Sequence, residues 1–493
     1  MTEVEPKEPP REAVDEQGLG SAYANRVLIV MALLLAFVVY IDVMLIPSLP
    51  AISAEYGVSR AQASLIISLY TVFGVAVIPI VGKLGDIYGK KRILVSVLAI
   101  YVPVATVTSF LPNFAEILVS RTVQGVGLGI LPLSISLARE QFPRNQVPKA
   151  QGIIAATQIA GGGAGLLAGA LIASVYGWQG NYHVAIPFLA VLSVTIFLLL
   201  EESPNRKPGA RLDYLGAAWL GTSLAAVVLG LSEGATWGWT SSSTLGLIFG
   251  GAALVIPLAF YESRLNEPIL DLRLLREKNV MLADIFVITY GVSWYLIFQA
   301  VTYILELSPP SGFGFSIIVT GLYLLPLVVV LLPVSYATGA LISKHGVKPF
   351  FYLSSVIGAA SCLLLSTYSS AETLIPLTTF FAVSLGFVSV SSQNLLVLSV
   401  RKSEMGIAAS MNTVFRYMGT SLGAPIAGAI LSTFVAAYPV AGHMVSLPTK
   451  EAFQYCFYVA LIGFAIIGAL TIFAHEIIGS RMETTSSQAE AHR

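Results

Sequence analysis

The chain has 493 residues, of which 56% are hydrophobic and 11% are charged, whereas soluble domains average about 45–50% and 25%. This composition excludes an ordinary soluble protein and indicates a chain that lies mostly within a lipid bilayer. The 27 Lys and Arg residues balance the 27 Asp and Glu residues and are dispersed over short loops. The continuous basic surface that a nucleic-acid partner needs is therefore not expected.

Residues 1–25 are acidic and rich in proline, which predicts a disordered cytoplasmic tail. Six apolar stretches follow that are long enough to cross a hydrocarbon core of about 30 Å. They occupy 27–49, 62–82, 93–111, 114–138, 150–175 and 182–200. We assign residues 26–200 to an N-terminal six-helix bundle.

Residues 201–278 are predicted to form a charged linker and two inserted transmembrane helices, near 212–231 and 244–261. Six more stretches form a predicted C-terminal six-helix bundle over 279–476, before a cytoplasmic tail at 477–493. They lie near 280–305, 316–342, 350–368, 374–398, 405–436 and 453–475. The sequence thus predicts an all-α integral membrane protein with fourteen transmembrane helices.

The distribution of Lys and Arg tests this count, because cytoplasmic loops carry an excess of both. With the N-terminus inside, only Arg60 and Lys450 fall on outer loops, while Arg121 and Arg416 fall inside spans. An error of one span would move every later loop to the other side and remove this asymmetry. The pattern favours fourteen spans with both termini in the cytoplasm.

The pattern G-x-L-x-x-x-x-G-x-K occurs twice, at residues 82–91 and 339–348. Each copy lies in a short basic gap between apolar stretches, which indicates equivalent turns in two related halves of a transporter. The first copy joins predicted spans two and three, and the second joins spans ten and eleven. The offset of eight spans, rather than six, predicts a two-helix insertion between the halves.

The chain resembles the major facilitator superfamily and, within it, the fourteen-span drug:proton antiporters. Residues 121–127, RTVQGVG, resemble the R-x-x-Q-G-x-G element of the fourth span, and residues 40–50 resemble the first-span L-D-x-T…A-L-P pattern. The first repeat is similar to the loop motif G-x-L-x-D-R-x-G-R-K, with Ile87 in place of an Arg. Its matching residues are Gly82, Leu84, Asp86, Gly89, Lys90 and Lys91.

Span five departs from the pattern of the antiporters. Residues 165–170, GLLAGA, correspond to their G-P-x-x-G-G element without the proline and one glycine, and residues 177–180, GWQG, replace G-W-R-W. The remaining glycines still predict a face on which another helix approaches closely. A purely structural packing face and a gating role both remain open.

Asp42 and Arg121 are predicted to couple transport to protons, because an acid inside a span normally faces a cavity or a partner. At 1.5 Å per residue, Asp42 lies about 22 Å from the inner end of span one, and Arg121 about 10 Å from the outer end of span four. Both therefore reach a similar depth. Arg121 favours the charged carboxylate when it is close, so a change in their distance would load or release a proton. A static ion pair is the alternative.

The resemblance implies that Asp86 acts as a latch, pairing with the opposite bundle in one conformation and releasing it in the other. An exposed surface salt bridge is the alternative. Ser343 stands at the equivalent position of the second copy, so only the first half would form a strong latch.

Arg416 in span thirteen resembles a recurring Arg of the fourteen-span branch, and Asp284 in span nine could pair with it or lie at the inner edge without a partner. A weakly defined substrate pocket is expected from polar and aromatic residues within the spans, although such aromatic residues also anchor helices at the membrane surface. Its candidates, with Arg416, are Tyr40, Tyr70, Gln124, Gln158, Trp294, Tyr295, Gln299, Gln393, Asn394 and Asn412.

The leading hypothesis is a secondary active transporter of the cell membrane that exports small hydrophobic or cationic compounds in exchange for protons. One charge moved through 100 mV supplies about 2.3 kcal/mol, enough for about a fortyfold gradient. No cofactor, metal or enzymatic activity is expected, since the chain has no phosphate-binding loop and no H-E-x-x-H motif. The partners are then substrate, protons and lipid, for a monomer. An importing symporter or uniporter, and a receptor that does not transport, are the alternatives.

Overall fold

The computed structural model describes residues 21–141, 147–202, 213–265, 268–400, 405–440 and 443–475. Residues 1–20 of the predicted N-terminal tail, most of the linker after residue 202 and the C-terminal tail lie outside these ranges. The side chains of Gln158 and Ser343 are also outside the described part of the chain.

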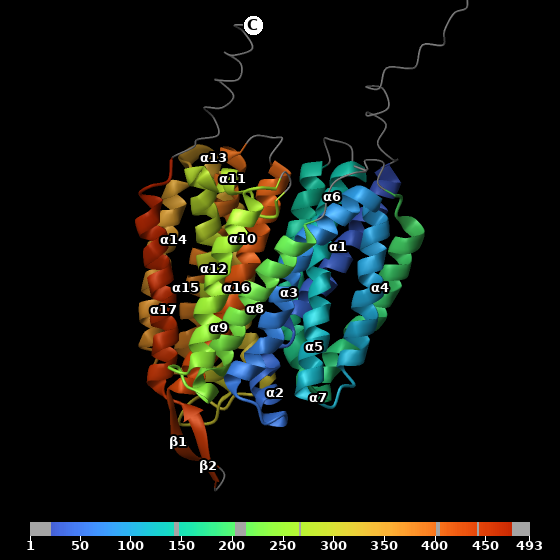
Figure 1. The fold of residues 1–493 in the computed structure, drawn as a ribbon. Coiled ribbons are helices and arrows are strands. Elements are labelled where there is room, and N and C mark those ends of the chain that lie inside the picture. Colours follow the sequence, from blue (N-terminus) through green and yellow to red (C-terminus); the bar gives the residue numbers. More distant parts are fainter. Residues whose placement is uncertain are drawn as a thin grey trace, which may run out of the picture.

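The first half of the chain forms the helices on the right of Figure 1, with α3 near the centre. The long element α7 has two legs that meet at Gly177, where φ is 72°, a conformation that glycine adopts without a steric penalty. The elements of this half are α1 (Ser21–Val43), η2 (Ile46–Ser48), α2 (Leu49–Glu55), α3 (Arg60–Tyr88), α4 (Lys90–Thr108), α5 (Phe114–Gln124), η3 (Gly125–Gly129), α6 (Ile130–Gln141) and α7 (Val147–Leu199).

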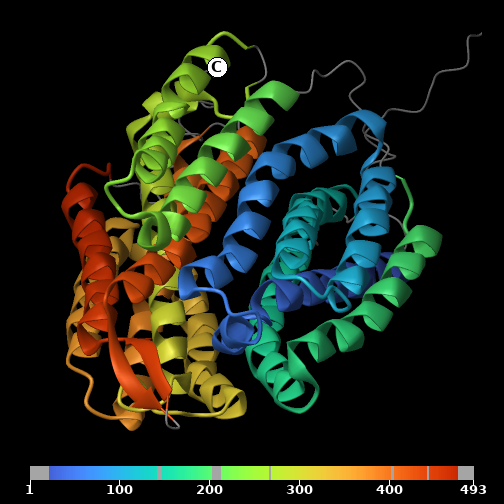
Figure 2. The same ribbon diagram turned by 60° about the horizontal axis from the view of Figure 1, so that its bottom comes forward.

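The region between the halves contains α8 (Tyr214–Trp237), α9 (Ser242–Ala253), α10 (Val255–Glu262) and the short α11 (Leu272–Arg276). Asp213 caps α8 by accepting a hydrogen bond from the Gly216 amide at 2.8 Å. Helix α8 packs against α3 of the first half, α16 of the second half and α9. The inserted helices therefore cover one side of the seam between the two halves (Figures 1 and 2).

The second half forms the helices on the left of Figure 1. They pack through α12 against α16, α13 against α15, and α14 against both α15 and α17. The elements are α12 (Lys278–Glu306), α13 (Ile317–His345), α14 (Lys348–Ser366), α15 (Ala371–Ser399), α16 (Met405–Thr433), β1 (Val435–Val440), β2 (His443–Pro448) and α17 (Lys450–Thr471).

Twelve helical segments within the described ranges are long and apolar enough to cross a membrane. One of them, Ala160–Leu199, is 40 residues long and contains the Gly177 kink, and the 29-residue helix α16 is not among the twelve. Large apolar side chains on the outer faces of several helices are exposed, among them Val175, Leu198 and Phe249. Such a surface is stable in lipid rather than in water.

The predicted all-α architecture is confirmed with one addition, a β-hairpin after α16. The predicted span at 405–436 ends as a helix at Thr433, and β1 pairs with β2 in antiparallel register from Val435 opposite Pro448 to Val440 opposite His443. Pro439 lies within β1 and cannot donate to a helical hydrogen bond, while the surrounding aromatic and β-branched residues favour an extended chain. We call the end of the molecule that carries β1 and β2 the hairpin end.

Candidate functional site

Asp42 lies near the end of α1, beside a cavity of about 20 Å³ at the interface of the two halves. This volume is sufficient for one water molecule. The carboxylate oxygen Oδ1 is buried and has no hydrogen-bond partner. Tyr417 of α16 contributes to the wall of this cavity from the second half. The first half contributes Leu35, Val38, Val39, Tyr70, Gly127, Leu128 and Leu131.

Arg121 on α5 is completely buried. Its Nη1 donates to Gln124 Oε1 at 3.1 Å, and its guanidinium carbon lies 4.5 Å from the centre of the Tyr70 ring. Longer contacts of 3.4 Å join the guanidinium to the backbone oxygens of Ile41 and Ile66 and to the Tyr182 hydroxyl. These contacts fix the guanidinium among α1, α3, α5 and α7.

Arg121 Nη1 contacts the backbone oxygen of Ile41, so the guanidinium lies against the segment of α1 that carries Asp42. The two side chains form no ion pair in the described structure, and Asp42 Oδ1 and Arg121 Nη2 are both buried without a hydrogen-bond partner. Buried charged groups normally have partners, because an unpaired one carries a large desolvation cost. The two residues therefore form an incompletely satisfied site rather than a closed salt bridge.

The glycines after Arg121 explain how this site is assembled. A Cβ atom on Gly125 would clash with the backbone oxygen of Tyr70, and one on Gly127 would meet the Tyr101 ring. The segment η3 is wound as a 3₁₀-helix, which breaks the single helix predicted at 114–138. The absence of side chains at these positions lets the backbone that follows Arg121 approach α3 and α4.

The glycines of predicted span five form a packing face against α1. A Cβ atom on Gly161 would meet the backbone of Ala36, one on Gly165 the backbone of Tyr40, and one on Gly169 the backbone of Met44. The contacts recur every four residues on both helices, as in membrane helices that pack through small residues. This face holds the helix that carries Asp42.

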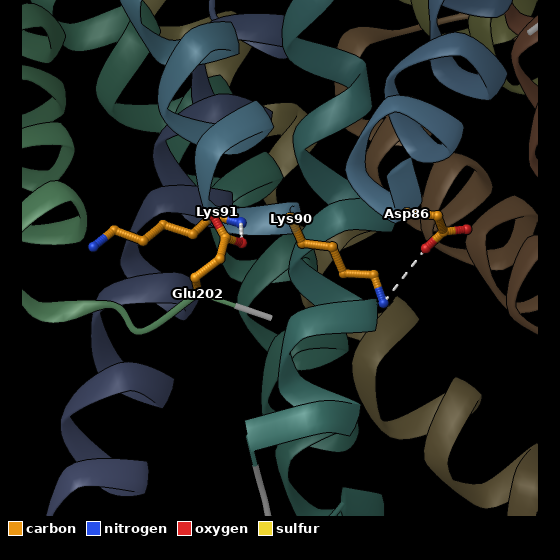
Figure 3. A network of polar contacts seen from close by, with 4 residues as sticks. All are labelled: Asp86, Lys90, Lys91 and Glu202. Carbon is orange, nitrogen blue, oxygen red and sulfur yellow. Dashed lines mark hydrogen bonds and ion pairs between the residues drawn. The ribbon is translucent and has the colours of Figure 1, made fainter. Parts of the chain in front are cut away.

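Helix α3 begins at the hairpin end, where Arg60 donates to the backbone oxygen of Ser446, so the first copy of the repeated loop motif, at the other end of this helix, lies opposite the hairpin. Figure 3 shows the polar contacts of this motif. Asp86 Oδ1 is 3.6 Å from Lys90 Nζ, so the ion pair joins residues of the same motif. The Asp86 side chain is 44% exposed and that of Lys90 is 7% exposed. In this structure Asp86 is therefore paired within its own turn rather than with the second half. Gly82, Leu84 and Gly89 belong to the same turn, and Gly89 has a φ of 109°.

Glu202 is a residue of this site that the sequence did not single out. Its carboxylate accepts hydrogen bonds from the backbone amides of Lys91 at 3.0 Å and Arg92 at 3.1 Å, while the Lys91 side chain points away (Figure 3). A carboxylate at a helix N-terminus is stabilised by free amides and by the helix dipole. A glycine is favoured at position 89 because its φ of 109° is rarely adopted by other residues, and a Cβ atom there would also meet this carboxylate. The acidic, proline-containing sequence around Glu202 is that of an ordinary charged linker, so nothing in the sequence indicated this contact.

A second buried acid, Asp284 on α12, binds Asn412 on α16. Asn412 Nδ2 donates to Asp284 Oδ1 at 2.8 Å, while Asp284 Oδ2 is buried without a partner. Arg416 does not pair with Asp284 in the described structure, and its Nε is also buried without a hydrogen bond. Neither possibility considered for Asp284 is observed: it does not pair with Arg416, and it is buried against Asn412 instead of lying at the inner edge without a partner.

The other pocket candidates fall into separate environments. Tyr40 donates to Asn181 Oδ1 at 2.8 Å and Gln124 Nε2 donates to Thr108 Oγ1 at 2.6 Å, so both are engaged in packing the first half. Gln299 is buried, with neither polar side-chain atom hydrogen-bonded. The remaining candidates are half-buried Trp294, which stacks on Phe298, buried Tyr295, exposed Gln393 and half-buried Asn394, which donates to the backbone oxygen of Val390.

No group of three or more His, Cys, Asp and Glu side chains within the described ranges is arranged to hold a metal ion. Cys362 and Cys456 are free and buried. What this site offers chemically is the Asp42 carboxyl beside a water-sized cavity, with the buried guanidinium of Arg121 on a neighbouring helix.

Comparison with known proteins gives a consistent family match. A profile of the Major Facilitator Superfamily matches residues 31–424. The chain is 28% identical over 445 residues to YvkA of Bacillus subtilis, an uncharacterized MFS-type transporter, covering 86% of this chain and 96% of YvkA. The multidrug transporter protein MdtP of B. subtilis is 24% identical (78% and 71% covered), and the tetracenomycin C resistance and export protein of Streptomyces glaucescens is 25% identical (78% and 72% covered).

Among solved structures, the chain is similar in fold to a bacterial homologue of the human lysosomal transporter Spinster, crystallised in an inward-facing and unoccupied conformation. The TM-score is 0.68 at 13% sequence identity, covering 92% of this chain and 98% of that one. At this identity the likeness establishes the fold alone. The matched family and the relatives are transporters rather than enzymes, and the many apolar spans place the chain in a cell membrane as a multi-pass protein.

Proposed function

The chain belongs to the Major Facilitator Superfamily, and we propose that it exports small hydrophobic or cationic compounds in exchange for protons. Two relatives are named for multidrug transport and for resistance and export, which supports this direction and substrate class. Because the energy source is an ion gradient, the transporter needs no nucleotide.

The observation that carries the proton-coupling proposal is the position of Asp42. Its carboxylate borders a cavity whose wall includes Tyr417 of the other half, so relative movement of the halves changes its surroundings. When water and Arg121 are close, the charged form is favoured, and when the site is desolvated the proton is retained. The buried and unpartnered Arg121 Nη2 is the group that would form a direct bond to the carboxylate in another conformation.

Alternating access supplies the movement. At the hairpin end the two halves are in contact: the Ala61 amide donates to Ser432 Oγ at 3.3 Å, and a Cβ atom on Gly428 would touch the Ala61 backbone. Gly321 on α13 packs against Ala170 on α7 at the same end. We assign this arrangement to a state in which the halves are closed against each other at the hairpin end.

The proposed topology has fourteen crossings with both termini in the cytoplasm. Counting the two legs of α7 separately and adding α16 to the other candidate segments gives this number. The hairpin end then faces outward, since Arg60 and Lys450 are the basic residues expected there. An impermeant label applied to intact cells reports on single cysteines placed at either end.

Transport in proteoliposomes with an imposed pH gradient tests the function. A panel of lipophilic cations is offered to the wild type, to Asp42→Asn and to Asp284→Asn. We expect wild-type transport in the direction opposite to the proton flux, and for Asp42→Asn the loss of any accumulation above the equilibrium concentration ratio. Asp284→Asn, which retains a side chain that can bind Asn412, serves as the matched control for loss of a buried acid.

Two outcomes would contradict the proposal. Full proton coupling in Asp42→Asn would remove the role given to Asp42. Movement of substrate in the same direction as protons would replace export by import, the alternative that the missing proline of the span-five element keeps in view.

A further inference from the structure

A second, larger cavity lies at the hairpin end, away from Asp42. Its volume is about 340 Å³, which is within the range of small-molecule sites. The first half contributes Pro50 and Ala51, and the second half contributes the end of α12, the loop between α12 and α13, the start of α13 and strand β2. These latter residues are Glu306, Leu307, Ser308, Phe315, Ser316, Ile317, Val445 and Leu447.

The walls combine apolar surface with one charged group. Phe315, Ile317 and Leu447 are among the apolar residues, and Glu306 is the charged side chain of the lining set. A pocket with mainly apolar walls and a single carboxylate is suited to a molecule that has an apolar body and one positive charge, because the charge gains an electrostatic partner while part of the body leaves water.

One oxygen of the Glu306 carboxylate lacks a hydrogen bond, and the side chain forms no ion pair within the described structure. Its Oε1 atom is buried, and the hydroxyl of Thr320, a neutral group, lies beside the carboxylate. Two cations at the hairpin end have other contacts: Arg60 donates to the backbone oxygen of Ser446 at 3.3 Å, and Lys450 lies over the Tyr368 ring. A buried carboxylate without a counterion is costly to the protein alone, and a bound cation would offset that cost.

We propose that this cavity is a second binding site, which takes a monovalent organic cation with an aromatic or aliphatic body through Glu306. The cavity is built from both halves and from the hairpin, so its shape depends on how the halves are packed. Its place on the export path rests on the proposed function. Binding itself does not, because it requires no gradient.

Protection of a single introduced thiol measures occupancy directly. Ala51 is an exposed residue of the cavity wall, whereas the two native cysteines are buried, so Ala51→Cys provides the accessible thiol for an impermeant maleimide. The protein is held in lipid nanodiscs without a pH gradient. The probes are benzyltriethylammonium and, as an uncharged analogue of similar size, N,N-diethylbenzamide.

We expect the cation to slow labelling in a saturable manner. The same protection should require about a tenfold or higher concentration of the neutral analogue. The cation should require a similar increase in concentration when Glu306→Gln is combined with Ala51→Cys. Glu451→Gln, an exposed acid in the first turn of α17 at the same end, is the matched control and should retain protection. Asp42→Asn should also retain it, because that acid lies at the other cavity.

Equal protection by the two probes, or unchanged protection in Glu306→Gln, would overturn the proposal. Ile317→Trp provides a second variant, which fills the cavity and should abolish protection while Glu306 is present. If the cation protects the thiol of the Ala51→Cys variant but no proton-driven transport is observed, the site stands and the export function fails. If transport occurs without any protection, the export function stands and this site fails.

Discussion

At the scale of single residues, the membrane-embedded charges share an unusual property. Asp42, Arg121, Asp284 and Arg416 each have at least one buried polar atom without a hydrogen-bond partner. Residues that served only to stabilise the fold would be expected to have their hydrogen bonds satisfied, since each unsatisfied group costs free energy. For Asp42 and Arg121, which lie close to the interface of the halves, this cost is consistent with groups whose partners change during a transport cycle.

The hydroxyl of Tyr40, in contrast, has a hydrogen-bond partner. Substitution of Tyr40 therefore distinguishes a packing role from contact with the substrate. The Tyr40 hydroxyl donates to Asn181, which in turn donates to the backbone oxygen of Gly169. Tyr40→Phe leaves Asn181 Oδ1 without its donor, so we expect a loss of about 1 kcal/mol in unfolding free energy, measured as a lower thermal midpoint in detergent. The KM for transport should not change.

Tyr176→Phe is the control for this substitution, because the Tyr176 side chain is 73% exposed and should tolerate the change. A raised KM for Tyr40→Phe with an unchanged thermal midpoint would instead place the Tyr40 hydroxyl on the substrate.

Some candidate site residues could be predicted from the sequence and others could not, and the difference lies in their position along the helices. An acid or base in the middle of a span is conspicuous, so Asp42, Arg121 and Arg416 could be singled out as candidates from the sequence. Glu202 and Glu306 lie at the ends of helices, where charged residues are ordinary. Their roles depend on contacts with α4 and with β2, and no local pattern encodes those contacts.

At the scale of elements, glycine contacts relate the two halves. In the first half, Gly161, Gly165 and Gly169 of α7 pack on α1. In the second half, Gly419 and Gly423 of α16 pack on the backbone of α12 in the same parallel sense. The helix pair α12 and α16 corresponds to spans nine and thirteen, eight positions after spans one and five. The structure thus agrees with the duplication that the repeated loop motif predicted.

The predicted boundaries failed where local geometry overrides hydrophobicity. The apolar run at 114–138 contains a 3₁₀ segment because its glycines are in close contact with α3 and α4. The run at 405–436 includes residues that pair as a strand. Hydropathy measures suitability for lipid, and it does not distinguish helical from extended chain over a few residues.

The neighbouring glycines Gly161 and Gly162 form a matched pair for testing the packing face. A Cβ atom on Gly161 would clash with the backbone of Ala36, whereas one on Gly162 would only approach Val39 Cγ1 at 3.7 Å. We expect Gly161→Ala to destabilise the protein by about 1–3 kcal/mol and Gly162→Ala to be neutral or slightly stabilising. Both gain the same helix propensity, so the difference in thermal midpoint reports the contact. Equal midpoints would show that α1 and α7 do not pack this closely.

At the scale of the whole molecule, the structure shows how the two halves pack against each other, which a repeat in the sequence does not reveal. The offset between the repeats predicted an insertion, but not that α8 would lie against both α3 and α16. Contacts between helices that are hundreds of residues apart depend on side-chain shape at each crossing. The closed hairpin end is therefore a property of the assembled halves.

A cross-link at that closed end tests whether the halves must separate there during transport. Ala61 and Ser432 belong to different halves, and the Ala61 amide lies 3.3 Å from Ser432 Oγ, so cysteines at these positions are close enough for a disulfide. We expect oxidation of Ala61→Cys/Ser432→Cys to reduce transport by about tenfold or more, with recovery after reduction, because alternating access requires this end to open. A disulfide between Ser354→Cys and Ser384→Cys is the control, since Ser354 Oγ donates to the Ser384 backbone oxygen within one half. That cross-link should leave transport active. Undiminished transport with the Ala61–Ser432 pair fully cross-linked would mean that the substrate passes without separation of the halves at the hairpin end.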